Sequence, residues 1–93
     1  MRTIRRTARF KKDYKREAKG RHRATLDEDL RKAVLLLAND ATVPPNYRDH
    51  PLTGEWKYFR DCHVKPDLVL IYHKSDAGTL DLVRLGSHSE LGL

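Results

Sequence analysis

The stretch CHVKPDLVLIY, residues 62–72, decides how the C-terminal half of the chain folds. Its last five residues, 68–72, form an unbroken apolar run of the length of a buried β-strand. The VKP segment before this run is a turn signal, so the preceding strand is expected to end at His63. Across a three-residue loop, residues 64–66, His63 and Asp67 become cross-strand neighbours whose side chains point to the same face of the sheet.

Three strands are expected in this half of the chain. Residues 55–63 lead into the quoted stretch, residues 68–74 contain its apolar run, and residues 79–86 follow the turn signal SDAG. Connections this short join antiparallel neighbours, so we expect a three-stranded meander.

The N-terminal half carries the period of a helix instead. Residues 2–6 predict a short first strand, and Thr7 is a candidate N-cap for a first helix that ends at Gly20. A second helix is predicted by a capping box at Thr25 and Glu28. Apolar residues then repeat on one face of this helix, at Leu26, Leu30, Ala33, Val34 and Leu37. The two helices are expected to form one side of the core.

A loop joins the helical half to the strands. The paired prolines of NDATVPP, residues 39–45, end the second helix, and an ordered loop carrying His50 follows. The predicted order is therefore strand, helix, helix and three strands, which is an α+β fold in a single domain spanning residues 1–93. No repeat, low-complexity tract or second domain boundary interrupts this order.

The composition agrees with one small, highly charged globular domain. Of the 93 residues, 39% are hydrophobic and 34% charged, which suffices for a single core and includes no stretch resembling a membrane span. The formal net charge of +6 attracts polyanions, among them RNA, DNA, acidic proteins and anionic membranes. Cys62 is the only cysteine, which excludes an internal disulfide and favours a reducing, cytoplasmic location.

Part of the positive charge lies on one face of the first predicted helix. Five cationic residues share that face: Lys11, Lys12, Lys15, Arg16 and Lys19. A charge run of this kind is more often a solvated helix face than a dedicated binding stripe. It still offers a surface that steers an acidic chain or ribosomal RNA toward the protein.

The topology brings several ionisable residues to one end of the sheet. Antiparallel pairing of the last two strands returns residues 86–88 to the start of the strand near Asp67, so His88 joins His63 and Asp67 there. The loop carrying His50 can fold over the same end. Histidine gives and takes protons near pH 7, and phosphodiester cleavage needs one group to remove a proton and another to donate one. The four residues therefore form a candidate acid–base site.

Two other interpretations use the same residues. Imidazole and carboxylate ligands suit zinc or ferrous iron, although no HxH or HExxH pair preorganises a metal site. Alternatively, the domain is a non-catalytic nucleic-acid or protein-binding module in which the histidines are incidental. The residues alone leave three classes open: an acid–base nuclease, a His/Asp metal-dependent hydrolase and a binding module.

Two segments resemble a known family. The string YRDHPLTGEWKYFRDCHVKPDLVLIY, residues 47–72, and the string RLGSHSEL, residues 84–91, are closely similar to the YafQ branch of the RelE superfamily of bacterial toxins. The resemblance implies a compact RelE-like fold and a toxin of a type II toxin–antitoxin pair, neutralised by a cognate antitoxin. It also implies a metal-independent endoribonuclease that needs no cofactor and cuts mRNA in the A site of the 30S ribosomal subunit.

The family's motifs carry its site residues onto this chain. In that family the active site consists of the histidine of DHPL, the histidine and aspartate of CHxxPD and the histidine of the terminal GSH motif. These positions match His50, His63, Asp67 and His88. Family members commonly have an aromatic residue directly after the Leu of the terminal motif, where this chain has Gly92. This departure implies either weaker or less selective cleavage, or stacking of an RNA base on another aromatic residue such as Trp56.

The implied mechanism is attack of the RNA 2′-OH on its own 3′-phosphate, which leaves a 2′,3′-cyclic phosphate and a free 5′-OH. Asp67 or His50 is the expected general base, and His88 is the expected general acid. His63 should offset negative charge on the phosphorane together with three cations: Lys57, Arg60 and Arg84.

Overall fold

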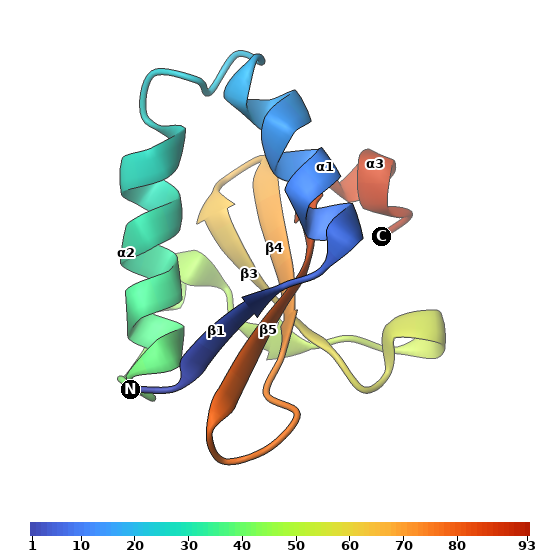
Figure 1. Cartoon of the computed structure of the whole chain (residues 1–93). Coiled ribbons are helices and arrows are strands. Elements are labelled where there is room, and N and C mark those ends of the chain that lie inside the picture. The colour runs from blue at the N-terminus through green and yellow to red at the C-terminus, as the bar shows by residue number, and fades with distance from the viewer.

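One five-stranded sheet forms the centre of the molecule, with its strands in the order β1-β5-β4-β3-β2 (Figure 1). The computed structural model describes all residues, 1–93. Its elements are β1 (Thr3–Arg6), α1 (Ala8–Ala18), α2 (Leu26–Ala38), β2 (His50–Pro51), β3 (Arg60–Lys65), β4 (Leu68–His73), β5 (Thr79–Gly86) and α3 (His88–Leu91). Two 3-10 turns, Pro45–Tyr47 and Gly54–Trp56, flank β2. β1 runs parallel to β5, and all other neighbouring strands are antiparallel.

The predicted α+β class and the order of strand, helix, helix and meander are confirmed. The last strand has the predicted bounds, Thr79–Gly86. The first strand of the meander begins at Arg60 and not at residue 55, because residues 54–56 form a 3-10 turn. β2 and α3 are absent from the predicted order, since elements of two and four residues are too short to leave a periodic pattern.

The starts of the two long helices differ from each other. Thr7 caps α1 as predicted, because its side chain accepts a hydrogen bond from the Phe10 N–H at 3.1 Å. The capping box predicted at Thr25 and Glu28 is wrong. The Thr25 side chain makes no cap hydrogen bond and instead accepts one from the Lys65 ammonium group at 2.7 Å. A contact between residues forty positions apart in the sequence therefore replaces the expected helix-cap hydrogen bond.

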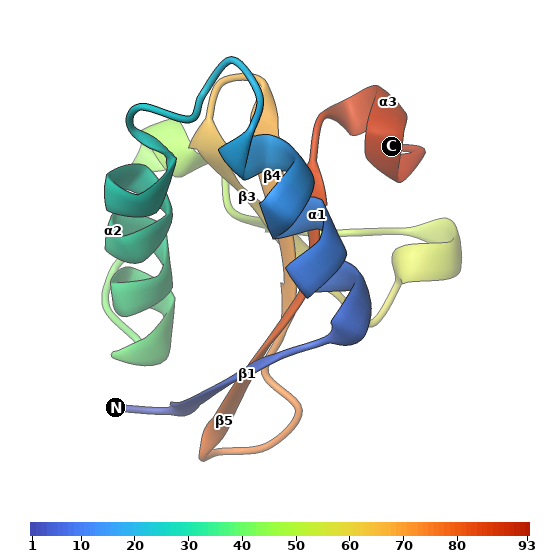
Figure 2. The same cartoon turned by 45° about the horizontal axis from the view of Figure 1, so that its top comes forward.

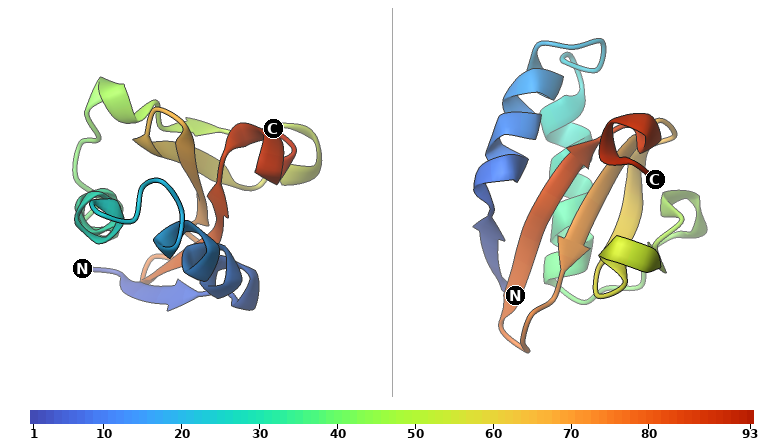
Figure 3. Two further views of the ribbon diagram at one scale, coloured as in Figure 1. Left: turned by 90° about the horizontal axis from the view of Figure 1, so that it is seen from above. Right: turned by 90° about the vertical axis from the view of Figure 1, so that its right-hand side faces the viewer.

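The two faces of the sheet are covered unequally. On one face lies the main core, which contains Phe10 of α1, six residues of α2 and apolar residues of β3, β4 and β5. α3 lies on the side opposite α2, together with the loop before β3 (Figure 3). A smaller cluster there unites Val69 and Ile71 of β4 with Leu91 of α3. β4 is therefore buried on both faces, which explains the unbroken apolar run in its sequence. No helix is long and apolar enough to cross a membrane.

Side-chain alternation along β3 separates the core from a polar surface. Cys62 and Val64 belong to the core under the helices, so Asp61 and His63 point to the opposite face. Burial raises the pKa of the Cys62 thiol to about 12, and the protonated thiol is unfit as a nucleophile. α1 lies against β5 on the helical side (Figure 2). The face that carries Asp61 and His63 is therefore not covered by the two long helices.

Candidate active site

The register of the sheet places three polar residues in one row across four strands. His50 of β2 pairs with Asp61 of β3, Asp61 with Ile71 of β4, and Ile71 with Arg84 of β5. Neighbouring strands lie about 4.8 Å apart, so His50 and Asp61 are within side-chain reach of each other. β2 is only two residues long, yet its pairing with β3 is what fixes His50 in this row.

A second row runs parallel to the first. His63 pairs with Val69, and Val69 pairs with Gly86 at the end of β5. The chain then turns at Ser87, whose side chain and backbone form a complete capping box with Glu90, and α3 begins at His88. The rings of His63 and His88 lie 5.0 Å apart between centroids. The predicted approach of these two histidines at one end of the sheet is confirmed.

An open cavity of about 800 Å³ lies over the first row and beside His88. Its wall includes His50, Asp61, Arg84 and His88, with Trp56 on the loop before β3. His88 is exposed and half of the His50 side chain is exposed, so both imidazoles are within reach of a substrate in the cavity. The cavity therefore combines exposed imidazole rings with a cation and an aromatic side chain.

Asp61 is the acidic residue at the centre of the histidines. Its side chain is buried and its Oδ1 atom has no hydrogen-bond partner, although His50 Nδ1 lies 3.1 Å from that oxygen. Burial raises the pKa of Asp61, and the charges of His50, His63 and His88 act against that rise.

The orientation of the His50 ring assigns its tautomer. Nδ1 lies 2.6 Å from the Arg48 carbonyl oxygen, and an oxygen of that kind only accepts hydrogen bonds. Nδ1 must therefore carry a proton and donate it to Arg48, although Asp61 is also close. The lone pair of the neutral ring is then on Nε2. In that tautomer, Nε2 is the ring nitrogen of His50 that can accept a proton.

Asp67 is not part of this cluster, although the sequence predicted that it would be. It lies in the turn between β3 and β4, where it forms an ion pair with Arg21 and lies 3.0 Å from His22 Nε2, both in the loop between α1 and α2. The predicted cross-strand pairing of His63 with Asp67 is wrong, since His63 pairs with Val69. A register shift between His63 and residue 65 shortens the turn and carries Asp67 beyond the end of the ladder.

The predicted RNA-binding residues divide into two groups. Arg84 and Trp56 line the cavity. Arg60 instead bonds to Asp49 and to the Tyr72 hydroxyl, both at 3.3 Å, on the helical side of β3. The Lys57 ammonium group lies 5.0 Å from the centre of the Tyr58 ring, and Lys57 does not line the cavity.

Sequence reasoning missed Asp61, although a signal for it exists. On a strand, a residue two positions before another shares its face, so the carboxylate at 61 had to lie beside His63. The possible metal ligands are not gathered in the way an ion requires: no group of three or more His, Cys, Asp or Glu side chains is arranged to hold one.

Comparison with known proteins places this site in context. A family model described as "Bacterial toxin of type II toxin-antitoxin system, YafQ" matches residues 2–92. The mRNA interferase toxin YafQ of Escherichia coli strain B / BL21-DE3 is 39% identical over 94 residues, which cover 97% of this chain and 95% of that toxin. Two further curated relatives align over 63% and 62% of their own length.

Solved structures of similar toxins share the fold. A copper-bound mutant toxin from Helicobacter pylori has a TM-score of 0.84 and 36% identity, covering 98% of this chain and 99% of that one. YafQ in the E. coli DinJ-YafQ complex has a TM-score of 0.78 and 35% identity, covering 98% of each chain. The chain belongs to the YafQ family of bacterial toxins of type II toxin–antitoxin systems.

Proposed function

We propose that this chain is the toxin of a type II toxin–antitoxin pair and that it cleaves mRNA in the A site of the ribosome. The observation that carries the proposal is the gathering of His50, His63 and His88 around Asp61, beside a cavity with Arg84 in its wall. The names of relatives, mRNA interferase toxins, support the same activity. The net charge of +6 favours a polyanionic substrate.

His50 is the proposed general base. Its Nδ1 proton is held by the Arg48 carbonyl, so Nε2 is the atom that takes the proton from the RNA 2′-OH. The oxygen then attacks the adjacent phosphorus. Asp67 is the other candidate for this role, but its ion pair with Arg21 must open before its carboxylate reaches RNA. His50 needs no such rearrangement.

His88 is the proposed general acid. It is exposed at the start of α3, where its ring gives a proton to the 5′-oxygen as that oxygen leaves. The products are a 2′,3′-cyclic phosphate and a free 5′-OH. The His63 ring lies 5.0 Å from the His88 ring between centroids, and the charge of Asp61 interacts with both imidazoles.

Arg84 and Trp56 are the proposed RNA contacts. The Arg84 guanidinium stabilises the charge that develops on the phosphorane, and Trp56 stacks on a base. Trp56 and Gly92 line the same cavity, so the tryptophan stands where a base would otherwise meet the aromatic side chain that position 92 lacks. Lys57 and Arg60 lie outside the cavity, so they are not among the proposed contacts of the scissile phosphate.

Mapping of RNA 5′ ends after induction of the toxin tests this proposal. We expect cuts within translated reading frames at a fixed codon position, and we expect them to disappear with His88→Gln. Cuts in untranslated RNA would instead indicate a ribosome-independent ribonuclease. An absence of cuts would favour the non-catalytic binding module.

The proposed chemistry proceeds without a metal ion. EDTA is therefore expected to leave cleavage of a free RNA oligonucleotide or of pre-assembled ribosome complexes unchanged, with ribosome integrity measured separately. Copper is the first ion to add back, because a similar toxin is copper-bound. A loss on chelation that stoichiometric metal restores would favour the His/Asp hydrolase instead.

The proposed partner is an acidic antitoxin, and both proteins are expected to act in the cytoplasm with the ribosome. A similar toxin is found in the DinJ-YafQ complex. Lys12 and Lys15 on α1 are exposed and form no ion pair within the chain, so they are free to steer an acidic segment. An antitoxin encoded with this toxin should abolish the cuts described above when it is co-expressed.

A further inference from the structure

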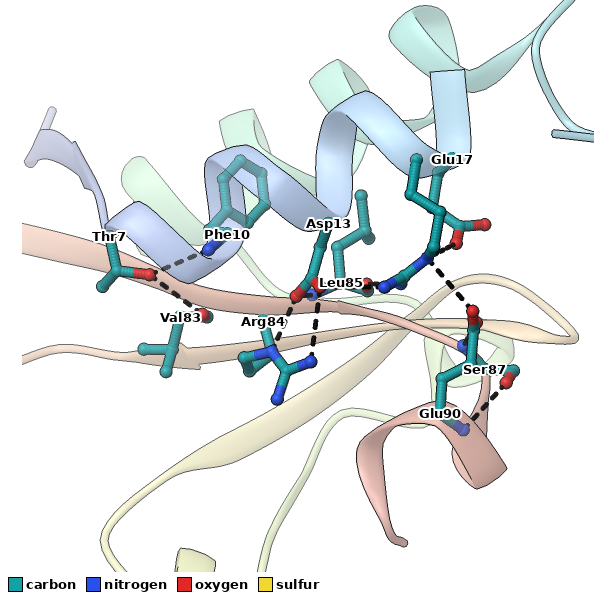
Figure 4. A network of polar contacts seen from close by, with 10 residues as sticks. Thr7, Phe10, Asp13, Glu17, Val83, Arg84, Leu85, Ser87 and Glu90 are labelled. Carbon is teal, nitrogen blue, oxygen red and sulfur yellow. Dashed lines mark hydrogen bonds and ion pairs between the residues drawn. The ribbon is translucent and has the colours of Figure 1, made fainter. Parts of the chain in front are cut away.

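Part of one edge of β5 has no neighbouring strand. Side chains from α1 and its N-cap cover that edge instead. β1 pairs only with the first half of β5, so the second half has no neighbour on that side. The Thr7 hydroxyl donates to the Val83 carbonyl at 2.9 Å (Figure 4). Asp13 accepts from the Leu85 N–H at 3.0 Å, and Arg16 donates to the Leu85 carbonyl at 2.8 Å. These three side chains satisfy the backbone groups that a further strand would have paired.

Asp13 is the centre of this contact. Its side chain is 5% exposed and accepts hydrogen bonds from Arg84 Nε at 2.7 Å, Arg84 Nη2 at 3.3 Å and Arg16 Nη1 at 3.0 Å. Burial alone would raise the pKa of Asp13. The hydrogen bonds from Arg84 and from the Leu85 backbone outweigh burial and hold the pKa below its ordinary value, so the carboxylate is charged at neutral pH.

Arg84 is held by one edge of its guanidinium group. Nε and Nη2 bind Asp13, whereas Nη1 makes no hydrogen bond within the chain. Asp13 is also the only acidic partner of Arg84. A register shift in β5, with Ile71 opposite Arg84 and Tyr72 opposite Leu82, places Arg84 on the strand where it lines the active-site cavity. The free edge of the guanidinium is thus available to a ligand in that cavity.

We propose that Asp13 is a positioning residue, which holds the Arg84 guanidinium from helix α1 so that its free edge faces the scissile phosphate. The inference rests on the proposed function, because it takes Arg84 to stabilise the charge that forms during RNA cleavage. Asp13 touches no substrate and acts through Arg84. A cation fixed before the substrate arrives needs no reordering in the transition state, and misplacement by an ångström costs on the order of 100-fold in rate.

The test is a double-mutant cycle on cleavage of ribosome-bound mRNA, with Asp13→Asn, Arg84→Gln and both together. Asn keeps the size of the side chain and one acceptor oxygen but removes the charge. We expect kcat to fall roughly 10- to 100-fold with Asp13→Asn and roughly 100- to 1,000-fold with Arg84→Gln, with little change in KM for Asp13→Asn. The double variant should be no slower than Arg84→Gln alone, because Asp13 acts through Arg84.

The matched control is Glu28→Gln, which removes one negative charge from an exposed position on α2, 70% exposed. It should cleave like the unmutated chain, and circular dichroism should show that every variant is folded. A loss in the double variant equal to the product of the two single losses would overturn the proposal. Wild-type kcat in Asp13→Asn would overturn it as well.

A second measurement needs neither RNA nor a mutation. In the unmutated free protein, the NMR signal of the Arg84 Nε–H should exchange with water slowly compared with that of Arg23, which is exposed and makes no side-chain hydrogen bond. Equal exchange rates would overturn the arrangement even if Asp13→Asn did not fold. A chain that cleaves no RNA but protects Arg84 Nε–H would overturn the proposed function and leave the arrangement standing, so the two failures are distinguishable.

Discussion

Asp13 and Asp61 are both buried aspartates, and the structure treats them in opposite ways. Asp13 is surrounded by N–H donors from two arginines and a backbone amide, whereas Asp61 keeps an oxygen without any hydrogen-bond partner. Bonding outweighs burial at Asp13 and lowers its pKa, while burial dominates at Asp61 and raises its pKa. A buried carboxylate whose oxygens are hydrogen-bonded is typical of a structural contact. A buried carboxylate with an unbonded oxygen next to titratable rings is typical of a functional site.

The same difference fixes the sign of each residue's contribution to stability. Because the pKa of Asp13 is lower in the folded state, its ionised form favours folding at any pH above the ordinary carboxyl value of about 3.9. Because the pKa of Asp61 is higher in the folded state, its ionisation opposes folding, and that cost is fully present above the raised value. The charge of Asp13 therefore stabilises the fold, whereas the charge of Asp61 destabilises it.

The largest expected effect lies on the side of Asp61. His50→Gln and His88→Gln should each lower the single-turnover cleavage rate by roughly 100- to 10,000-fold, since each removes a proton-transfer group. Asp67→Asn should lose less than His50→Gln, because Asp67 is bound to Arg21. Rates on programmed ribosomes measure all three. A larger loss with Asp67→Asn would reassign the base to Asp67 and require its ion pair to open during the reaction.

The next effect separates the two aspartates by stability. Asp13→Asn should lower the free energy of unfolding at pH 7 by about 1–3 kcal/mol, because buried donors lose their charged acceptor. Asp61→Asn should leave it unchanged or raise it by about 1 kcal/mol while cleavage falls, as expected for a residue kept for activity. Urea unfolding followed by tryptophan fluorescence of Trp56 measures both. Equal destabilisation by the two substitutions would contradict the opposite effects on stability that we expect for the two aspartates.

The pH dependence of unfolding sharpens the comparison further. The stability difference between the unmutated chain and Asp13→Asn should be constant from pH 7 to about pH 5 and should shrink as the pH falls below about 4, through the lowered pKa of Asp13. The difference for Asp61→Asn should have the opposite sign and also fade in acid, where Asp61 is protonated in both states. Urea midpoints at a series of pH values provide the data, and a difference for Asp13→Asn that persists at pH 2 would contradict the assignment.

The smallest effect concerns the cationic face of α1. Arg16 does not belong to that face as a free cation, because it is bound to Asp13, Glu17 and Glu90. Reversal of Lys12 and Lys15 to Glu should slow association with the antitoxin about 10-fold at low salt and less at high salt, with the chemical step unchanged. Stopped-flow association rates over a salt series measure this. Rates that do not change at any salt concentration would return the lysines to a solvated helix face.

The sequence was sufficient wherever local geometry decides the outcome. The hairpin of β4 and β5 has short connections, so the approach of His88 to His63 follows from strand pairing alone. Asp61 was equally accessible, since it precedes His63 by two residues on one strand. The three-residue loop expected at residues 64–66 drew attention to Asp67 instead.

The parts that could not be predicted depend on long-range contacts or on single-residue shifts in register. A one-residue irregularity at the end of β3 moves Asp67 from the sheet to a turn, and no composition signal marks it. Lys65 reaches the Thr25 side chain and so replaces the expected helix cap. The bond between Asp13 and Arg84 joins residues 71 positions apart, which periodicity cannot reveal.

The parallel pairing of β1 with β5 also affects how the protein is made. The first strand of the chain finds its partner only in the last one, and His88 comes later still, in the final helix. During translation the N-terminal residues leave the ribosome before β5 and His88 do. Neither the pairing of β1 with β5 nor the approach of His63 to His88 can therefore form until those later residues have emerged. β1 stays without a strand partner for most of the synthesis of this fold.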